Sequence, residues 1–415
     1  MTLIFDPKTN KWKMALRVII LGIILMLGVF YALKTLNDSK DLWSKQDFRQ
    51  YWSAGKLLLN NQNPYSFSGN ESFQSAISGL TLVTFVPPWA ILWLSPLSFL
   101  PFCISEFVWL TTNIVFLFVS GYILWVLNIQ YITREDIFYL PPLWSFLLFG
   151  TFYPGLYCLK MGQASIVLLF GMSLFLYFRR RNNFYISGIC LSALLIKPHL
   201  FSLLWVGIAY EALRRRNWDT ILGIATILLA SICTVILLHP SIFIDYFEYV
   251  RQPKYVWPEN VSIGGFLGAM GYHENSINAP ATNASFIPVL IACLFFIIHL
   301  KKRKDFSLNE NLPIVISLSI FVTPYGWVTD QVLLLFPYIA ICSFVVKMNR
   351  RYSFFLIIGG LVINASFGFV HFTGVIPEYM FFPVPLLFAT AYHKIKMRFL
   401  RVHGMQSHQS NLFEG

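Results

Sequence analysis

Apolar runs separated by short polar segments cover most of the chain. A helix needs about 20 apolar residues to cross a membrane, and shorter runs are tolerated where they line a cavity inside a protein. The pattern therefore predicts an all-α polytopic membrane protein with about 11–13 transmembrane helices. The runs lie at about 14–34, 81–101, 104–127, 137–157, 163–178, 184–196, 199–213, 218–238, 285–300, 312–325, 328–346, 352–371 and 379–393.

Basic residues at the ends of these runs predict the orientation, because loops rich in Lys and Arg stay in the cytoplasm. Four of them lie between Lys8 and Arg17, at the N-terminal end of the first run. The later basic clusters fall on the same side only if the run 81–101 does not cross the membrane. Its four prolines, from Pro87 to Pro101, favour a broken, re-entrant or interfacial segment. About twelve spans then remain, with both termini in the cytoplasm.

The composition excludes a soluble protein. Of the 415 residues, 56% are hydrophobic and 12% are charged, whereas about 25% are charged in soluble domains. A net charge of +12 would indicate nucleic-acid binding in a soluble chain. Here the basic residues lie between apolar runs, so the expected partner is membrane lipid and not nucleic acid.

Neither a disulfide framework nor a metal site is predicted. The cysteines are scattered and are interpreted as small packing residues, and the histidines lack the spacing of metal ligands. The sequence has no Gly-rich phosphate loop, nucleophile elbow or nucleotide-binding fingerprint. We therefore expect no cofactor, and a sugar donor would have to arrive on a lipid. The cysteines are Cys103, Cys158, Cys190, Cys233, Cys293 and Cys342.

With this topology, nearly all unusual polar residues at membrane depth fall on the outer face, which predicts a site there. A single transmembrane domain is expected over residues 1–401, followed by a disordered cytoplasmic tail at 402–415. Its two large outer loops are 35–80 and 239–284. Four shorter outer turns are expected at Met161–Gln163, Lys197–His199, Pro324–Trp327 and 372–378.

The first outer loop contains an apolar stripe at helical spacing, formed by Phe48, Tyr51, Trp52 and Leu58. Because Tyr and Trp belong to this stripe, the segment 46–59 is interpreted as an amphipathic helix at the membrane interface. Asp47 at its start could cap free backbone N–H groups. It could equally be a general base that deprotonates a sugar hydroxyl at the membrane surface. The pattern leaves both roles open.

Two turns between short apolar runs carry further candidates. Lys197 and His199 lie where an ionisable group at membrane depth indicates function, because burying it in lipid is costly. Lys197 could hold a donor phosphate, or it could be a snorkelling lysine at a hairpin tip. Gln163 follows Gly162 and is either a turn residue or a sugar contact.

A later break in the apolar pattern brings an acid to the start of a span. Asp330 follows the Pro324–Trp327 turn, and a carboxylate in this position indicates a cavity. Trp327 is either a stacking platform for a sugar or an anchor at the interface.

These motifs occur in an order that resembles glycosyltransferase family 87, membrane enzymes of the GT-C superfamily that use polyprenyl-phosphate sugars. The first-loop run from Asp47 to Tyr65 is similar to the family's signature there, although it has Tyr51-Trp52 where two tyrosines are common. The resemblance covers about residues 14–345. Its other elements are Pro87-Pro88-Trp89 with the later prolines, Gly162-Gln163, Lys197-Pro198, and Thr323-Pro324-Tyr325 with Asp330.

The resemblance implies an inverting hexosyltransferase with Asp47 as the catalytic base. The donor would be polyprenyl-phosphate mannose, and the acceptor a glycolipid or glycan. Neither a nucleotide nor a metal would be required, and the setting would be a bacterial inner membrane with the site on its outer face. Lys197 with His199 would hold the phosphate, and the other substrate contacts would be Arg49, Tyr51, Gln163, Trp327 and Asp330.

Two other functions fit the composition. A secondary transporter or lipid-linked-sugar flippase would show inverted repeats and ionisable groups near the bilayer midplane. A glycan polymerase or ligase would use a diphosphate-linked donor and larger outer loops. The polar groups lie mostly near one face, which favours an enzyme over a transporter.

Overall fold

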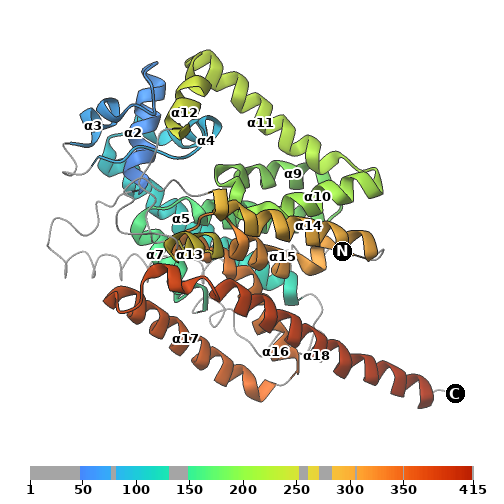
Figure 1. Ribbon diagram of the computed structural model, residues 1–415. Helices are drawn as coiled ribbons and strands as arrows, with labels where there is room; N and C mark the ends of the chain where they lie inside the picture. Colours follow the sequence, from blue (N-terminus) through green and yellow to red (C-terminus); the bar gives the residue numbers. More distant parts are fainter. Residues whose placement is uncertain are drawn as a thin grey trace, which may run out of the picture.

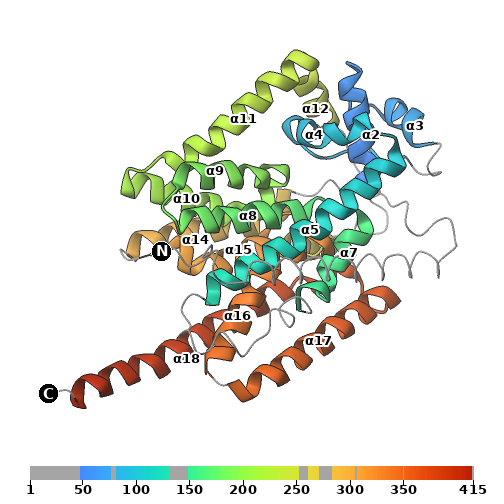
Figure 2. The same ribbon diagram turned by 180° about the vertical axis from the view of Figure 1, so that it is seen from behind.

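The computed structural model describes residues 47–75, 81–129, 148–251, 260–270, 283–303, 306–348 and 350–413, which form helices and connecting turns and contain no strand (Figures 1 and 2). The α-helices are α2 (Asp47–Leu59), α3 (Phe67–Gln74), α4 (Pro88–Leu94), α5 (Phe102–Ile129), α7 (Tyr153–Met161), α8 (Ser165–Arg179), α9 (Phe184–Leu191), α10 (Ser202–Arg215), α11 (Asp219–Leu238), α12 (Ile242–Arg251), α13 (Ile263–Met270), α14 (Ile287–Lys302), α15 (Leu308–Val322), α16 (Leu335–Met348), α17 (Arg350–Thr373) and α18 (Val384–Phe413). Short 3₁₀ helices are η1 (Ser95–Phe99), η3 (Ser192–Ile196), η4 (Pro198–Phe201), η5 (Asn283–Phe286), η6 (Val328–Leu334) and η7 (Glu378–Phe381).

Three helical segments are long and apolar enough to cross a membrane, namely Phe102–Asn128, Asp219–Leu238 and Val328–Val346. Shorter apolar helices accompany them. This confirms the all-α polytopic membrane protein. The number of spans stays a prediction, because the run 14–34 and most of 137–157 lie outside the described residues. The division into a domain at 1–401 and a tail at 402–415 also stays a prediction; α18 continues through most of that tail.

The proline-rich run 81–101 does not form a spanning helix, as predicted. Its first residues are not helical, α4 has seven residues, and the 3₁₀ helix η1 follows. Seven helical residues extend about 10 Å, a third of the hydrocarbon thickness. Pro88 begins α4, and Pro96 lies where the α-helix gives way to η1.

The first-loop helix begins at Asp47 as predicted and ends before a turn in which Asn61 takes a positive φ of 55°. Its surroundings differ from the prediction. An interfacial helix should expose its polar side, but ten of the 13 residues of α2 are buried, including Arg49 and Gln50. The polar side is covered because α3 packs on it, where Ser53 donates a hydrogen bond to Asn70. A location of this helix at the membrane surface stays a prediction.

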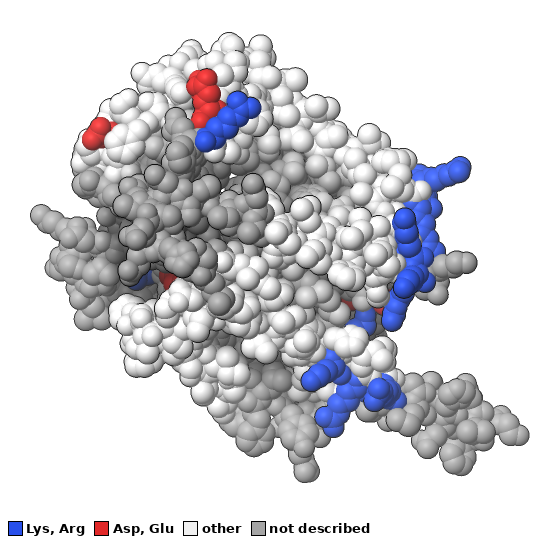
Figure 3. All heavy atoms as spheres, viewed as in Figure 1, with Lys and Arg blue, Asp and Glu red and all other residues white. Residues whose placement is uncertain are grey.

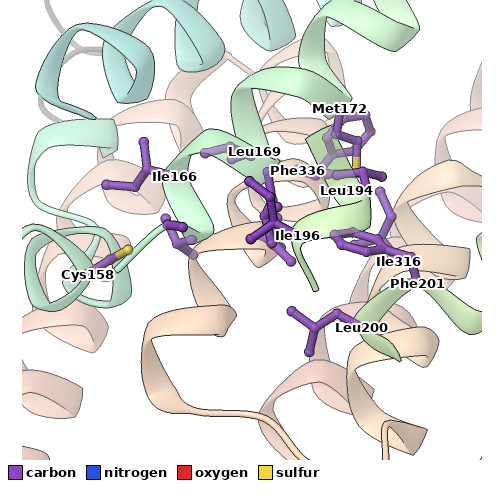
Figure 4. Packing of buried hydrophobic residues seen from close by; sticks show 14 of the residues in the cluster. Cys158, Ile166, Leu169, Met172, Leu194, Ile196, Leu200, Phe201, Ile316 and Phe336 are labelled. Carbon is purple, nitrogen blue, oxygen red and sulfur yellow. The ribbon is translucent and has the colours of Figure 1, made fainter. Parts of the chain in front are cut away.

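A hydrophobic core lies beneath the turns that carry the polar candidates. Figure 4 shows side chains from α8, η3, η4, α15 and α16 meeting in this core. Cys158 at the end of α7 is fully buried in it, which agrees with its interpretation as a packing residue. The core holds the turns that contain Gln163, Lys197 and Asp330 in fixed relative positions. Its labelled members are Cys158, Ile166, Leu169, Met172, Leu194, Ile196, Leu200, Phe201, Ile316 and Phe336.

Basic side chains gather at one end of the molecule, on the right in Figure 3. The last turns of α8, α10 and α14 carry arginines and lysines. The opposite ends of α8 and α10 adjoin the turns at Gln163 and Lys197. The candidate turns therefore lie away from the basic end.

Helices α9 and α11 approach each other closely through glycines, as small residues permit in membrane proteins. A Cβ atom on Gly188 would lie 2.1 Å from the backbone oxygen of Thr220. We expect Gly188→Ala to separate the two helices and to lower the free energy of unfolding by about 1–3 kcal/mol. Thermal unfolding of the detergent-solubilised protein measures this loss. The control is Gly359→Ala, whose Cβ atom would meet nothing within 4 Å; equal losses in both variants would contradict the close packing.

Candidate active site

Three turns that are far apart in the sequence converge at one place. The first follows α7, which is capped by Gly162 with a left-handed backbone (φ 67°), so that the chain changes direction at Gln163 and enters α8. Lys197 separates η3 from η4, and Pro198 begins η4. The third turn begins at Thr323, where α15 stops, and leads into η6 with Asp330.

The Lys197 ammonium is the centre of the cluster. Its Nζ lies 2.6 Å from Oδ1 of Asp330, 2.9 Å from Oε1 of Gln163 and 3.2 Å from Oγ of Ser165. Lys197 is 9% exposed and Asp330 is 1% exposed. Lys197 is therefore a member of a buried ion pair, not a lysine that snorkels to the surface.

Asp330 is held by several donors besides the lysine. The Ser165 hydroxyl donates to Oδ1 at 2.5 Å, and the backbone N–H of Trp327 donates to Oδ2 at 3.0 Å. These hydrogen bonds and the ion pair compensate for the burial of the carboxylate. Trp327 thus enters the cluster through its backbone.

Asp47 joins the cluster from α2. The amide nitrogen of Gln50 donates to Oδ1 of Asp47 at 2.7 Å, and the Gln163 side chain also hydrogen-bonds this carboxylate. The Tyr51 hydroxyl, one turn along α2, donates to Oε1 of Gln163 at 3.2 Å. Gln163 therefore connects the first-loop helix with Lys197, and the two carboxylates belong to one polar network.

Burial raises the pKa of the Asp47 carboxyl to about 6. The positive charge of Lys197 and the hydrogen bond from Gln163 act in the opposite direction, and the negative charge of Asp330 adds to the rise. A carboxylate with this pKa is largely ionised at neutral pH and is still a stronger base than an ordinary Asp. Such a pKa suits a general base.

His199 and Arg49 take other positions. The His199 ring packs against the Tyr325 ring, with centroids 3.8 Å apart and ring planes tilted by 30°. Arg49 is 2% exposed, and its Nε has no hydrogen-bond partner within the described part of the chain. No described hydrogen bond connects either side chain to Lys197. The structure thus brings together Asp47, Tyr51, Gln163, Lys197 and Asp330 among the predicted residues.

Sequence reasoning missed two residues of the network. Ser165 follows Gln163 by two positions, and Gln50 follows Asp47 by three. Three positions correspond to one helical turn, so a search for polar residues one turn from each candidate would have found Gln50. A serine at the start of a helix is indistinguishable from an ordinary capping residue.

Two other histidine clusters lie outside this network. His239 binds both Ser241 and Asp245 through the same nitrogen, Nε2, so these residues cannot act as a hydrolytic triad. His371 links Tyr153 and Glu378 through opposite ring nitrogens, at 2.6 and 2.7 Å. Across the described ranges, no group of three or more His, Cys, Asp or Glu residues could hold a metal ion.

The fold and the network define a helical membrane protein in which two carboxylates and a lysine meet at the ends of short helices. The sequence model of glycosyltransferase family 87 matches residues 85–324, more than half of the chain. The chain belongs to glycosyltransferase family 87 and is a glycosyltransferase. No curated protein and no solved structure matches it at a significant level.

The matched segment is shorter than the resemblance inferred from the motifs. It includes Gln163, Lys197 and His199, but it begins after Asp47 and ends before Asp330. The roles of these two acids therefore depend on the geometry of the network and not on the match.

Proposed function

We propose that this glycosyltransferase transfers a hexose, specifically mannose, from a polyprenyl-phosphate donor to a hydroxyl group of a glycolipid or glycan, with Asp47 as the general base. The observation that supports this most is the position of Asp47, which shares Gln163 with the buried Lys197–Asp330 pair and has a pKa of about 6. A proposed base, Asp47, and a cation, Lys197, are thus held next to the same glutamine in a membrane protein.

The proposed reaction is a single displacement with inversion. The acceptor oxygen attacks the anomeric carbon and gives its proton to Asp47. The bond between the anomeric carbon and the phosphate oxygen breaks, and its electron pair leaves with polyprenyl phosphate. Tyr51, Arg49, Gln163, Trp327 and Asp330 would contact the sugar or the acceptor, and His199 would help Lys197 to hold the phosphate. No step calls for a nucleotide.

The hydrogen bonds of Lys197 have to rearrange before it can bind the donor phosphate. An ammonium group has three N–H donors, and those of Lys197 are engaged by Asp330, Gln163 and Ser165. A donor phosphate would displace Gln163 or Ser165, because these acceptors are neutral and the Asp330 carboxylate is charged. Binding of the donor would then change the hydrogen bonds around Asp47 through Gln163.

We also propose that the site opens to the outer side of a bacterial inner membrane, with both termini in the cytoplasm. The basic ends of α8, α10 and α14 lie opposite the network, as the positive-inside rule requires of that orientation.

The pH dependence of transfer tests the role of Asp47. A general base must be ionised, so kcat/KM should be level above the raised pKa of about 6 and fall about tenfold per pH unit below it. The measurement is the initial rate of transfer in nanodiscs between about pH 4.5 and 8. Asp47→Glu should keep an acidic limb. A profile of the wild type without any limb near pH 6 would contradict the assignment.

The reaction class is tested with purified protein in nanodiscs and four donors: polyprenyl-phosphate mannose, polyprenyl-phosphate glucose, a diphosphate-linked sugar and a nucleotide sugar. We expect mannose transfer from the first donor, with one free polyprenyl phosphate released for each sugar transferred. Transfer from only the diphosphate donor would instead indicate a polymerase or ligase. Movement of intact donor between leaflets without release of polyprenyl phosphate would indicate a flippase.

A further inference from the structure

Helix α12 continues a membrane-facing surface. It follows α11, a 20-residue apolar helix in which only four residues are buried inside the protein. The exposed part of α11 includes Leu229 and Leu237, which face lipid in a spanning helix. The chain turns at Pro240, where His239 hydrogen-bonds Asp245 at 2.7 Å, and the two helices meet there in Figure 1.

The sequence of α12 forms three stripes at three-residue spacing. The inner stripe is aromatic and partly buried, with Tyr246 and Tyr249 on Tyr65 at centroid distances of 5.2 and 5.7 Å. The outer stripe is apolar and turned away from the protein, with exposures of 62%, 55% and 50%. The third stripe is charged. The stripes are Phe243, Tyr246 and Tyr249; Ile244, Phe247 and Val250; and Asp245, Glu248 and Arg251.

We propose that α12 is an interfacial helix that lies in the membrane leaflet at its end of α11, with Ile244, Phe247 and Val250 in the lipid. Such a helix combines an apolar face in the acyl region with a charged face toward water. Continuity with the lipid-facing surface of α11 selects lipid over a protein partner.

The inner stripe of α12 faces the part of the protein that contains the Lys197 network. Tyr246 lies near Tyr325. The Tyr325 ring packs against that of His199, two positions after Lys197, with centroids 3.8 Å apart. Helix α12 therefore stands between lipid and one wall of the network. A lipid-linked donor would reach the network past α12, a consequence that depends on the proposed function.

Site-specific photocrosslinking tests the location of α12. A benzophenone amino acid replaces Phe247 in one variant of the full chain and Glu248 in a second, both in vesicles of phosphatidylcholine and phosphatidylglycerol. Both side chains are exposed, so the two positions differ only in the direction in which they point from α12, toward the apolar or the charged side of the helix. We expect phospholipid adducts at Phe247 to exceed those at Glu248 about tenfold, as the transfer free energy of an aromatic side chain implies. Equal adduct yields, or a covalent dimer from the Phe247 position, would overturn the proposal.

A kinetic measurement tests the access path. Phe247→Asp should raise KM for the long-chain donor severalfold and leave KM for a water-soluble short-chain donor unchanged, and Glu248→Gln should change neither. An equal change with both donors would contradict the path. If the wild type accepts no polyprenyl-phosphate donor, the proposed function fails, and the crosslinking result still decides the location of α12.

Discussion

Replacing Asp47 by asparagine should reduce kcat for sugar transfer about 10³-fold and leave the protein folded. A positioned general base contributes about 10²- to 10⁴-fold to a rate. Asparagine has nearly the same shape and can still accept the hydrogen bond that Gln50 donates to Asp47 at 2.7 Å. It cannot take a proton from the acceptor. Single-turnover transfer in nanodiscs measures the loss of rate separately from donor binding.

The matched control is Glu71→Gln, which removes an exposed carboxylate from α3, the helix that packs on α2. This variant should transfer sugar at the wild-type rate. A folded, donor-binding Asp47→Asn protein with wild-type activity would exclude Asp47 as the base.

Replacing Lys197 by methionine should both destabilise the protein and abolish transfer. Asp330 would remain 1% exposed with its cation removed. Loss of one partner from a buried ion pair costs about 3–5 kcal/mol, because the remaining charge is uncompensated. Thermal unfolding in detergent and transfer assays in nanodiscs measure the two effects.

The double variant Lys197→Met with Asp330→Leu separates stability from activity. Replacing both charges by apolar groups removes the uncompensated carboxylate, so most of the stability should return. Transfer should remain absent, because the phosphate would still lack its cation. Recovery of transfer in the double variant would show that the pair is only structural.

The sequence was sufficient to locate the turns of the site. Pro324, Gly162 and Pro198 interrupt apolar runs, and each interruption lies beside an ionisable or amide side chain. Burying a charge at membrane depth is costly, so Lys197 and Asp330 could be identified as candidate site residues from the sequence alone. Alternation of the spans placed these turns on one face, and the structure brings them together.

The sequence could not predict which groups would pair. Lys197 and Asp330 are 133 positions apart, and no local spacing connects them. The sequence also could not predict that α2 is buried on its polar side. Helical periodicity identifies one apolar face and does not show that α3 covers the polar one. Helix α12 was not recognised within the predicted loop 239–284, because its three stripes repeat every third residue and do not give a simple two-sided pattern.

The single oxygen of Gln163 that accepts from both Tyr51 and Lys197 has a consequence for proton movement. An amide does not take up and release protons near neutral pH, unlike a histidine in the same place. Gln163 therefore connects Asp47 to the Lys197–Asp330 pair through hydrogen bonds and is not itself a proton relay between them. A proton that Asp47 receives as the proposed base should return to the water on the side of the site. Above the second pKa of the released phosphate monoester, about 6, turnover in sealed vesicles should therefore acidify this compartment.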